Sequence, residues 1–139
     1  EDAKMASMAL GVNKLVIDPS NSDIVYAGTT RGLFKTLNKG ASWTKVPMNF
    51  DVSYVSSLVI NPENSFHLYL GTSAGIFESQ DGGKSWIPKH EGLENLNIRV
   101  LATDPKETKI LYCGTNGGGL YKSINGGTSW TSIPLALPH

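Results

Sequence analysis

The sequence contains one cysteine, no excess of either charge and no long apolar run. Cys113 alone cannot form a disulfide within the chain or build a cysteine-cluster zinc site. Because twelve basic residues balance twelve acidic ones, the strongly basic surface of a nucleic-acid or anionic-membrane binder is not expected. The longest apolar runs are too short to cross a bilayer. The composition therefore predicts a soluble protein with no nucleic-acid partner and no membrane partner.

A sustained 3.6-residue apolar period with helix caps is also lacking, so we expect almost no helix. The sequence instead contains three repeats, which begin at Leu15, Leu58 and Leu101. Prolines and Gly-Thr pairs recur 43 residues apart at Pro19, Pro62 and Pro105 and at Gly28, Gly71 and Gly114. Self-similarity at a period of this length indicates a repeat architecture.

Each repeat divides into four short β-type runs separated by turn residues. In the second repeat these runs cover residues 57–60, 67–72, 75–79 and 85–89. Four strands in a unit of about 40 to 45 residues are typical of a propeller blade. We therefore predict an all-β domain over residues 1–139, with three four-stranded antiparallel blades at about 15–46, 58–89 and 101–133.

An eight-residue segment precedes the last run of each repeat. It reads SQDGGKSW at 79–86, TLNKGASW at 36–43 and SINGGTSW at 123–130. The second copy matches the Asp-box pattern S-x-D-x-G-x-[ST]-W, and the sister copies carry asparagine in place of the aspartate. The chain therefore resembles the BNR, or Asp-box, β-propellers, which include sialidases, xyloglucan-cleaving glycoside hydrolases, the sortilin luminal domain and photosynthetic assembly factors.

The Asp-box segments are predicted to be structural. An Asp or Asn side chain can accept hydrogen bonds from nearby backbone N–H groups, and glycine supplies a positive φ. Asparagine replaces aspartate in two of the three copies, which suits a turn cap and not a catalytic carboxylate. The predicted structural residues are Asn38, Gly40, Trp43, Asp81, Gly83, Trp86, Asn125, Gly127 and Trp130.

No metal or cofactor site is expected. The segment DPSNSD (18–23) is rich in oxygen ligands, but its sister NPENSF loses both terminal carboxylates, so a turn is the better interpretation. Cys113 occupies the position of Ala27 and Leu70 and is predicted to be a buried small residue. Aromatic residues that recur in register are expected to pack between blades.

Binding residues are sought among the polar residues that differ between repeats. In the resembling family, binding sites usually occupy the face opposite the Asp boxes, which the loops between strands two and three and between blades form. Those loops contain residues 49–54 and 90–99, together with Arg31, Ser73 and residues 116–118. The ligand-binding candidates are Arg31, Asp51, Tyr54, His90, Glu91 and Asn97, with Glu94 and Arg99 nearby.

Enzymatic function is weighed against binding. Sialidases hold their substrate with three arginines, and this sequence has only Arg31 and Arg99. Glycoside hydrolysis requires two carboxylates, a role that Asp51 and Glu91 could fill across an oligomer. We therefore predict a non-catalytic binding or scaffold module with a glycan or protein ligand. A glycoside hydrolase, or a fragment of a longer propeller, is the alternative.

Self-association is also expected. Propellers close with roughly four to eight blades, and a cut array leaves apolar faces open at both ends. Three blades per chain would close as half of a six-bladed propeller in a homodimer. The family resemblance implies a secreted or extracytoplasmic location.

Overall fold

The computed structural model describes residues 10–50 and 54–135. Within these residues the chain forms twelve strands and no helix, arranged in three separate four-stranded antiparallel sheets. Each sheet is a meander in which every strand pairs with the next one in sequence. The predicted all-β fold and the three four-stranded units are confirmed.

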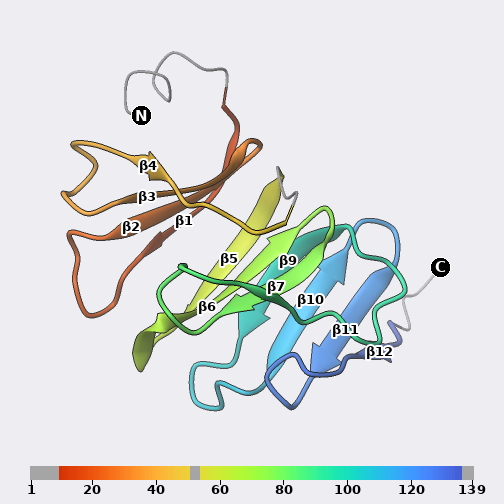
Figure 1. Cartoon of the computed structure of the whole chain (residues 1–139). Coiled ribbons are helices and arrows are strands. Elements are labelled where there is room, and N and C mark those ends of the chain that lie inside the picture. The colour runs from red at the N-terminus through yellow and green to blue at the C-terminus, as the bar shows by residue number, and fades with distance from the viewer. Residues whose placement is uncertain (1–9, 51–53, 136–139) are drawn as a thin grey trace.

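The three sheets are named blades 1 to 3 (Figure 1). Blade 1 contains β1 (Val12–Ile17), β2 (Val25–Thr29), β3 (Gly32–Thr36) and β4 (Thr44–Lys45). Blade 2 contains β5 (Val55–Asn61), β6 (Asn64–Thr72), β7 (Gly75–Ser79) and β8 (Ile87–Pro88). Blade 3 contains β9 (Ile98–Thr103), β10 (Leu111–Thr115), β11 (Gly119–Ser123) and β12 (Thr131–Ile133).

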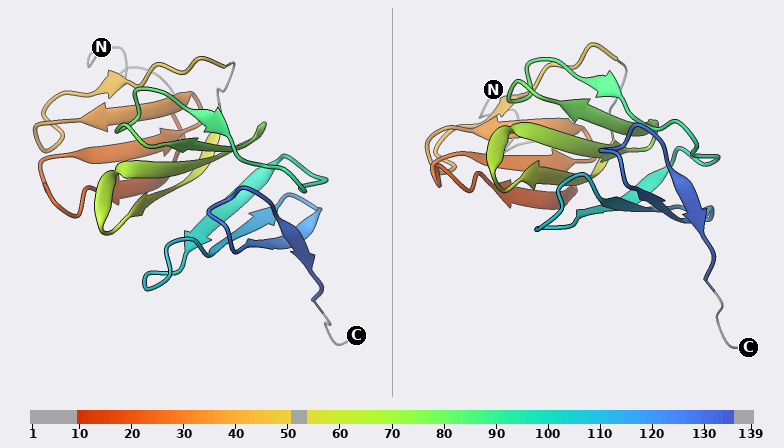
Figure 2. Two further views of the ribbon diagram at one scale, coloured as in Figure 1. Left: turned by 60° about the horizontal axis from the view of Figure 1, so that its bottom comes forward. Right: turned by 90° about the horizontal axis from the view of Figure 1, so that it is seen from below.

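Blade 2 lies between blades 1 and 3, as Figures 1 and 2 show. The first strands of successive blades are neighbours, since β1 contacts β5 and β5 contacts β9. The Gly-Thr pairs of the repeats explain how these strands approach so closely. A Cβ atom on Gly28 would lie 2.7 Å from Val55 Cγ1, and one on Gly71 would lie 2.9 Å from Ile98 Cγ2. Glycine is therefore required where one blade meets the first strand of the next.

Two hydrophobic cores fill the joints between blades. In the first core, Tyr26, Leu33 and Val46 of blade 1 pack with blade 2 residues that include Leu58 and Trp86. The second core joins Tyr69 and Ile76 of blade 2 to Leu101, Cys113, Tyr121 and Trp130 of blade 3. Side chains alternate along the strands of blade 2, so one face of that blade enters the first core and the opposite face enters the second.

Cys113 is fully buried in the second core. Burial raises the pKa of its thiol to about 12, so the nucleophilic thiolate is disfavoured at neutral pH. The residue therefore acts as a small hydrophobic side chain, as its place in the repeat predicts.

The DPSNSD segment forms a turn between β1 and β2. Asp18 accepts hydrogen bonds from the Ser20 backbone N–H at 2.8 Å and from the Ser20 hydroxyl at 2.9 Å. Burial acts to raise the pKa of Asp18, but these hydrogen bonds bring it below its ordinary value. The carboxylate thus closes the turn, as the comparison with its sister segment predicts.

Candidate functional site

Each blade has a β-bulge at the same place in its first strand. Val12 and Lys14 pair with Thr29 and Gly28, which leaves the residue between them unpaired. The same skip occurs between Val55 and Ser57 in β5 and between Ile98 and Val100 in β9. The bulged residues are Asn13, Ser56 and Arg99, which are 43 residues apart. Because a bulge redirects a side chain out of the regular alternation, these three residues leave their sheets on the same side.

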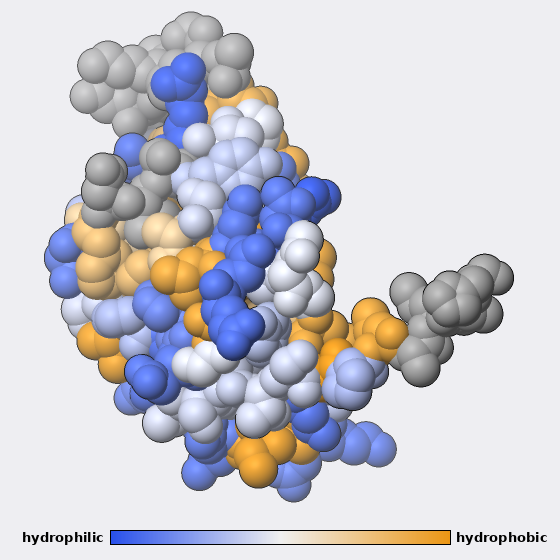
Figure 3. Space-filling model, turned by 90° about the vertical axis from the view of Figure 1, so that its right-hand side faces the viewer, coloured by the Kyte–Doolittle hydropathy of each residue, from blue (hydrophilic) through white to orange (hydrophobic). Residues whose placement is uncertain are grey.

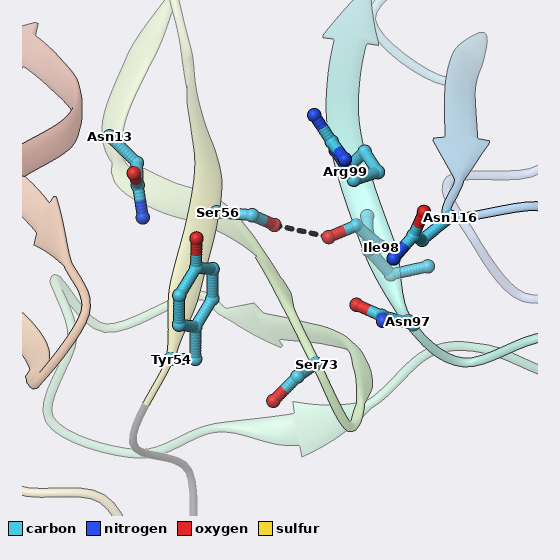
Figure 4. Close-up of a pocket in the computed structure, with 8 residues that line it drawn as sticks. All are labelled: Asn13, Tyr54, Ser56, Ser73, Asn97, Ile98, Arg99 and Asn116. Atoms are coloured by element: carbon cyan, nitrogen blue, oxygen red, sulfur yellow. Dashed lines mark hydrogen bonds between the residues drawn. The ribbon is translucent and has the colours of Figure 1, made fainter.

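Two of the bulged side chains connect their blade to the next one. Asn13 Nδ2 donates a hydrogen bond to the Val55 carbonyl at 2.9 Å. The Ser56 hydroxyl donates to the Ile98 carbonyl, the equivalent acceptor one blade later (Figure 4). The bulge therefore positions a side chain at the joint between two first strands.

The bulges border a cavity of about 500 Å³. Its lining comes from all three blades and consists of Asn13, Tyr54, Ser56, Ser73, Asn97, Ile98, Arg99 and Asn116 (Figure 4). A recurring backbone hydrogen bond holds its loops together. The Ser73 N–H donates to the Tyr54 carbonyl at 3.3 Å, and the Asn116 N–H donates to the Asn97 carbonyl at 2.8 Å. The cavity is therefore built from equivalent positions of successive repeats.

The lining is polar and carries a single formal charge. Three amides and two hydroxyls can both donate and accept hydrogen bonds, whereas the Arg99 guanidinium can only donate. Tyr54 adds a partly exposed aromatic ring. None of the lining residues described is a carboxylate. The arrangement is suited to holding a neutral or anionic polar ligand, and the described lining residues do not include the carboxylate pair that a glycosidase requires.

The cavity contains some of the candidates predicted from the sequence. Tyr54 and Asn97 line it, and so do three neighbours from the same loops, Ser73, Arg99 and Asn116. Arg31, His90 and Glu91 are not among the lining residues described, and Asp51 lies outside the described residues. His90 Nδ1 lies 3.3 Å from the Ile76 backbone nitrogen, and its ring meets Phe77 edge-on at 5.8 Å.

Glu91 lies at the joint of blades 2 and 3. Its side chain is exposed, and its backbone carbonyl accepts a hydrogen bond from the Trp130 N–H at 3.0 Å.

Asn13 and Ser56 were not predicted, because they lie inside strands and the candidates came from loops. Ile98 lies in the 90–99 segment but was not selected, because it is apolar. One sequence signal could have revealed Asn13 and Ser56. They align with Arg99 at intervals of 43 residues, and each repeat has a different polar residue at this position.

The three octapeptide turns share one hydrogen-bond pattern. Asp81 Oδ1 accepts from the Ser85 N–H at 2.9 Å and from the Ser79 hydroxyl at 2.8 Å. Asn38 accepts from the Ser42 N–H at 2.9 Å, and Asn125 accepts from the Ser129 N–H at 3.0 Å. An amide oxygen thus makes the same turn contact as a carboxylate oxygen. These contacts support a structural role for all three turns.

Acid should weaken the Asp81 turn selectively. Hydrogen bonds from Ser85, and then from Ser79, lower the pKa of Asp81 to about 2 from its ordinary 3.8. A carboxyl group with a depressed pKa stabilises the fold above its unfolded pKa and loses that contribution as pH falls toward the folded value. We expect Asp81→Asn to keep the fold and to flatten the stability loss between about pH 4 and pH 2.

Urea unfolding followed by far-UV circular dichroism at pH 6, 4 and 2.5 measures this effect. The matched control is Asp23→Asn, because Asp23 lies in another turn and its side chain is half-exposed. Equal flattening in both variants, or unfolding of Asp81→Asn at neutral pH, would contradict the assignment.

Blade 2 also contains a buried polar cluster that its sister blades lack. Glu78 is only 5% exposed, and its Oε2 lies 2.7 Å from His67 Nε2. Lys89 Nζ lies 3.8 Å from Glu78 Oε1 and 3.4 Å from the Thr128 hydroxyl of blade 3. Tyr69 stands beside Glu78 and donates its hydroxyl to the Gly126 carbonyl at 2.7 Å. The joint between blades 2 and 3 is therefore partly polar.

Comparison with known proteins supports the fold and leaves the function open. A scan against protein-family models gave no match, and a search of curated proteins gave none. Among solved structures, an ancestral GH74 enzyme is 27% identical with a TM-score of 0.73, over 90% of this chain and 18% of its own length. The GH74 xyloglucanase of Xanthomonas campestris is 18% identical with a TM-score of 0.69, over 92% of this chain and 24% of its own.

A different kind of protein shares the same fold. YCF48 bound to D1 peptide is 16% identical with a TM-score of 0.68, over 90% of this chain and 40% of its own length. The GH74 enzymes and YCF48 are β-propeller proteins, so the three blades form part of a propeller. The chain spans less than half the length of each of these structures.

Proposed function

We propose that the chain is a non-catalytic binding module built on Asp-box propeller blades, and that its cavity holds a polar ligand. The observation that carries this proposal is the lining itself. Amides, hydroxyls, one aromatic ring and one guanidinium converge there, and no carboxylate is among the lining residues described. Such a set recognises a ligand by hydrogen bonds and offers no acid and base pair.

A glycan is the ligand that this lining favours. Sugar hydroxyls both donate and accept, which matches the amides of Asn13, Asn97 and Asn116. The ring of Tyr54 adds an amphipathic surface for a sugar face. The likeness to GH74 enzymes supports a glycan, whereas the likeness to YCF48 supports a protein segment. A peptide should therefore be tested as a ligand beside the glycan.

A glycoside hydrolase is the second candidate, favoured by the 27% identity with a GH74 enzyme. Its site would form across an oligomer and would use Glu91 together with Asp51, which lies outside the described residues. Release of reducing ends from xyloglucan, abolished by Glu91→Gln, would support the enzyme. Binding without release would support the module.

We also propose that the chain self-associates to cover the ends of its blade array, and that it works in a secreted or extracytoplasmic setting. The first proposal is supported by apolar side chains that are exposed at both ends of the array. The second is supported by the Asp-box resemblance, and fractionation of the native source would test it.

Calorimetric titration of the 139-residue chain with a xyloglucan oligosaccharide tests the binding proposal. We expect Tyr54→Ala and Asn97→Ala each to weaken binding by about threefold to tenfold, which corresponds to about 0.5–1.5 kcal/mol for one lost contact. Asn49→Ala is the matched control, because Asn49 is an exposed amide that is not among the lining residues.

Binding that is equal in Tyr54→Ala, Asn97→Ala and Asn49→Ala would place the ligand outside the cavity. A peptide with a free terminal carboxylate serves as the second probe. If the chain binds the peptide and no glycan, and the cavity variants weaken that binding, the ligand of the cavity is a protein segment.

A further inference from the structure

The first strands of the three blades carry equivalent apolar residues with very different exposure. Val55 and Ile98 are buried, whereas their blade 1 equivalent Val12 is 53% exposed. The same holds three residues further along the strand, where Leu15 is 61% exposed and its equivalents Leu58 and Leu101 are buried. In blades 2 and 3 these side chains are covered by the preceding blade. The corresponding surface of blade 1, defined by Val12, Leu15 and Ile17, is named the leading face.

The opposite end of the array shows the complementary pattern. Tyr26 and Tyr69 are buried under the following blade, but their blade 3 equivalent Tyr112 is 36% exposed. Val100 on the neighbouring strand is exposed as well. Figure 3, which shows the side of the molecule nearest blade 3, has hydrophobic patches separated by hydrophilic residues. The surface defined by Val100, Tyr112 and Ile133 is named the trailing face.

The bulges add a polar contact to each joint. Asn13 of blade 1 donates to the Val55 carbonyl of blade 2, and Ser56 of blade 2 donates to the Ile98 carbonyl of blade 3. Arg99 is the third member of this series, and Val12 holds the equivalent carbonyl in blade 1. A trailing face that met a leading face in the same geometry would place the Arg99 guanidinium at that carbonyl.

The two faces cannot meet within one three-blade array, because blade 2 lies between blades 1 and 3 (Figures 1 and 2). A second copy carries the same two exposed faces. The net charge of the chain is zero at pH 7, so two copies are not held apart by like charge. Each face has the residues that form a blade joint elsewhere in the chain, so the complementary face of a second copy is the surface that fits it.

We propose that two copies associate head to tail, with the trailing face of each copy against the leading face of the other. Arg99 then donates to the Val12 carbonyl of the second copy, and two sets of three blades close one ring. The cavity becomes part of a channel that both copies line. This inference rests on the proposed self-association and names the surfaces that make it.

Single-face variants of the 139-residue chain test the proposal. Leu15→Asp places a charge on the leading face, and Tyr112→Asp places one on the trailing face. Both side chains are exposed in one copy, so neither substitution disturbs a core, and thermal unfolding by circular dichroism checks this. Light scattering over a concentration series gives the mass of each sample.

We expect the unsubstituted chain to be a dimer and each variant alone to be a monomer, with dimerisation weakened at least tenfold. In an equimolar mixture the intact trailing face of Leu15→Asp meets the intact leading face of Tyr112→Asp. One undamaged joint then forms, so the mixture should regain dimer mass. Leu37→Asp is the control that leaves the dimer intact, because the equivalent residues Gln80 and Ile124 stay exposed at the two joints that already exist.

Other outcomes would overturn the proposal in distinguishable ways. A dimer that only one of the two variants weakens would mean a symmetric contact between like faces. A monomeric chain at every concentration would remove the self-association itself and would mean that further blades of a longer chain cover the ends. Glycan or peptide binding by such a monomer would still support the proposed function.

Discussion

Replacement of Trp86 by alanine is expected to lower the free energy of unfolding by about 3–5 kcal/mol, the usual cost of removing a buried aromatic side chain. Trp86 is almost fully buried and lies in the core that joins blades 1 and 2. Its indole N–H donates to the Gly83 carbonyl at 3.1 Å, within the same octapeptide turn. The substitution therefore opens a cavity between blades and removes a contact that holds the turn.

Urea unfolding measured by far-UV circular dichroism gives the loss. Trp43→Ala is the matched control, because Trp43 occupies the same place in the blade 1 turn but is only half-buried. We expect a clearly smaller loss there, since less of the Trp43 side chain is buried and less apolar surface is therefore exposed by its removal. Equal losses in the two variants would mean that the tryptophans stabilise their own blades and not the joints.

The fold could be predicted from the sequence because the same residues recur in three copies. Each copy has glycines at the same place and turn residues at the same spacing, and few folds other than stacked four-stranded units fit that pattern. The structure adds the reason for those glycines. Gly28 and Gly71 lie where the first strand of the next blade passes, so even a methyl group would meet Val55 or Ile98.

The candidate site was only partly predictable. Tyr54 and Asn97 were identified from their loops, but Asn13 and Ser56 sit inside predicted strands. A regular strand alternates its side chains, and a bulge breaks that alternation without a sequence signature of its own. His90 is a polar residue unique to its repeat, and its ring packs on Phe77 beside the β7 backbone. Its role as a binding residue stays a prediction.

The polar joint between blades 2 and 3 yields the second large prediction. Glu78→Ala should lower the free energy of unfolding by about 3–5 kcal/mol, because removing one partner of a buried ion pair leaves the others uncompensated. Glu78 is buried against His67, and Lys89 is within ion-pair distance. The same urea experiment measures the loss. Glu63→Ala is the control, since Glu63 is an exposed glutamate at a turn of the same blade.

The sister blades show how the cluster could be replaced as a unit. Glu78 aligns with Lys35 and Lys122, His67 with Ile24 and Ile110, and Lys89 with Val46 and Ile133. Glu78→Lys alone would place a second ammonium group beside Lys89 and leave His67 without its carboxylate partner, so it should destabilise at least as much as Glu78→Ala.

The triple variant Glu78→Lys, His67→Ile, Lys89→Val should recover most of that loss, because it recreates the composition of the joint between blades 1 and 2. In that joint Lys35 lies over the Tyr26 ring at 5.1 Å, and Tyr69 offers the equivalent ring beside position 78. Recovery of the free energy of unfolding would mean that the three residues are coupled and replace, as a set, the residues found at the other blade joint. Additive losses across the three positions would mean that each is fixed separately by its own surroundings.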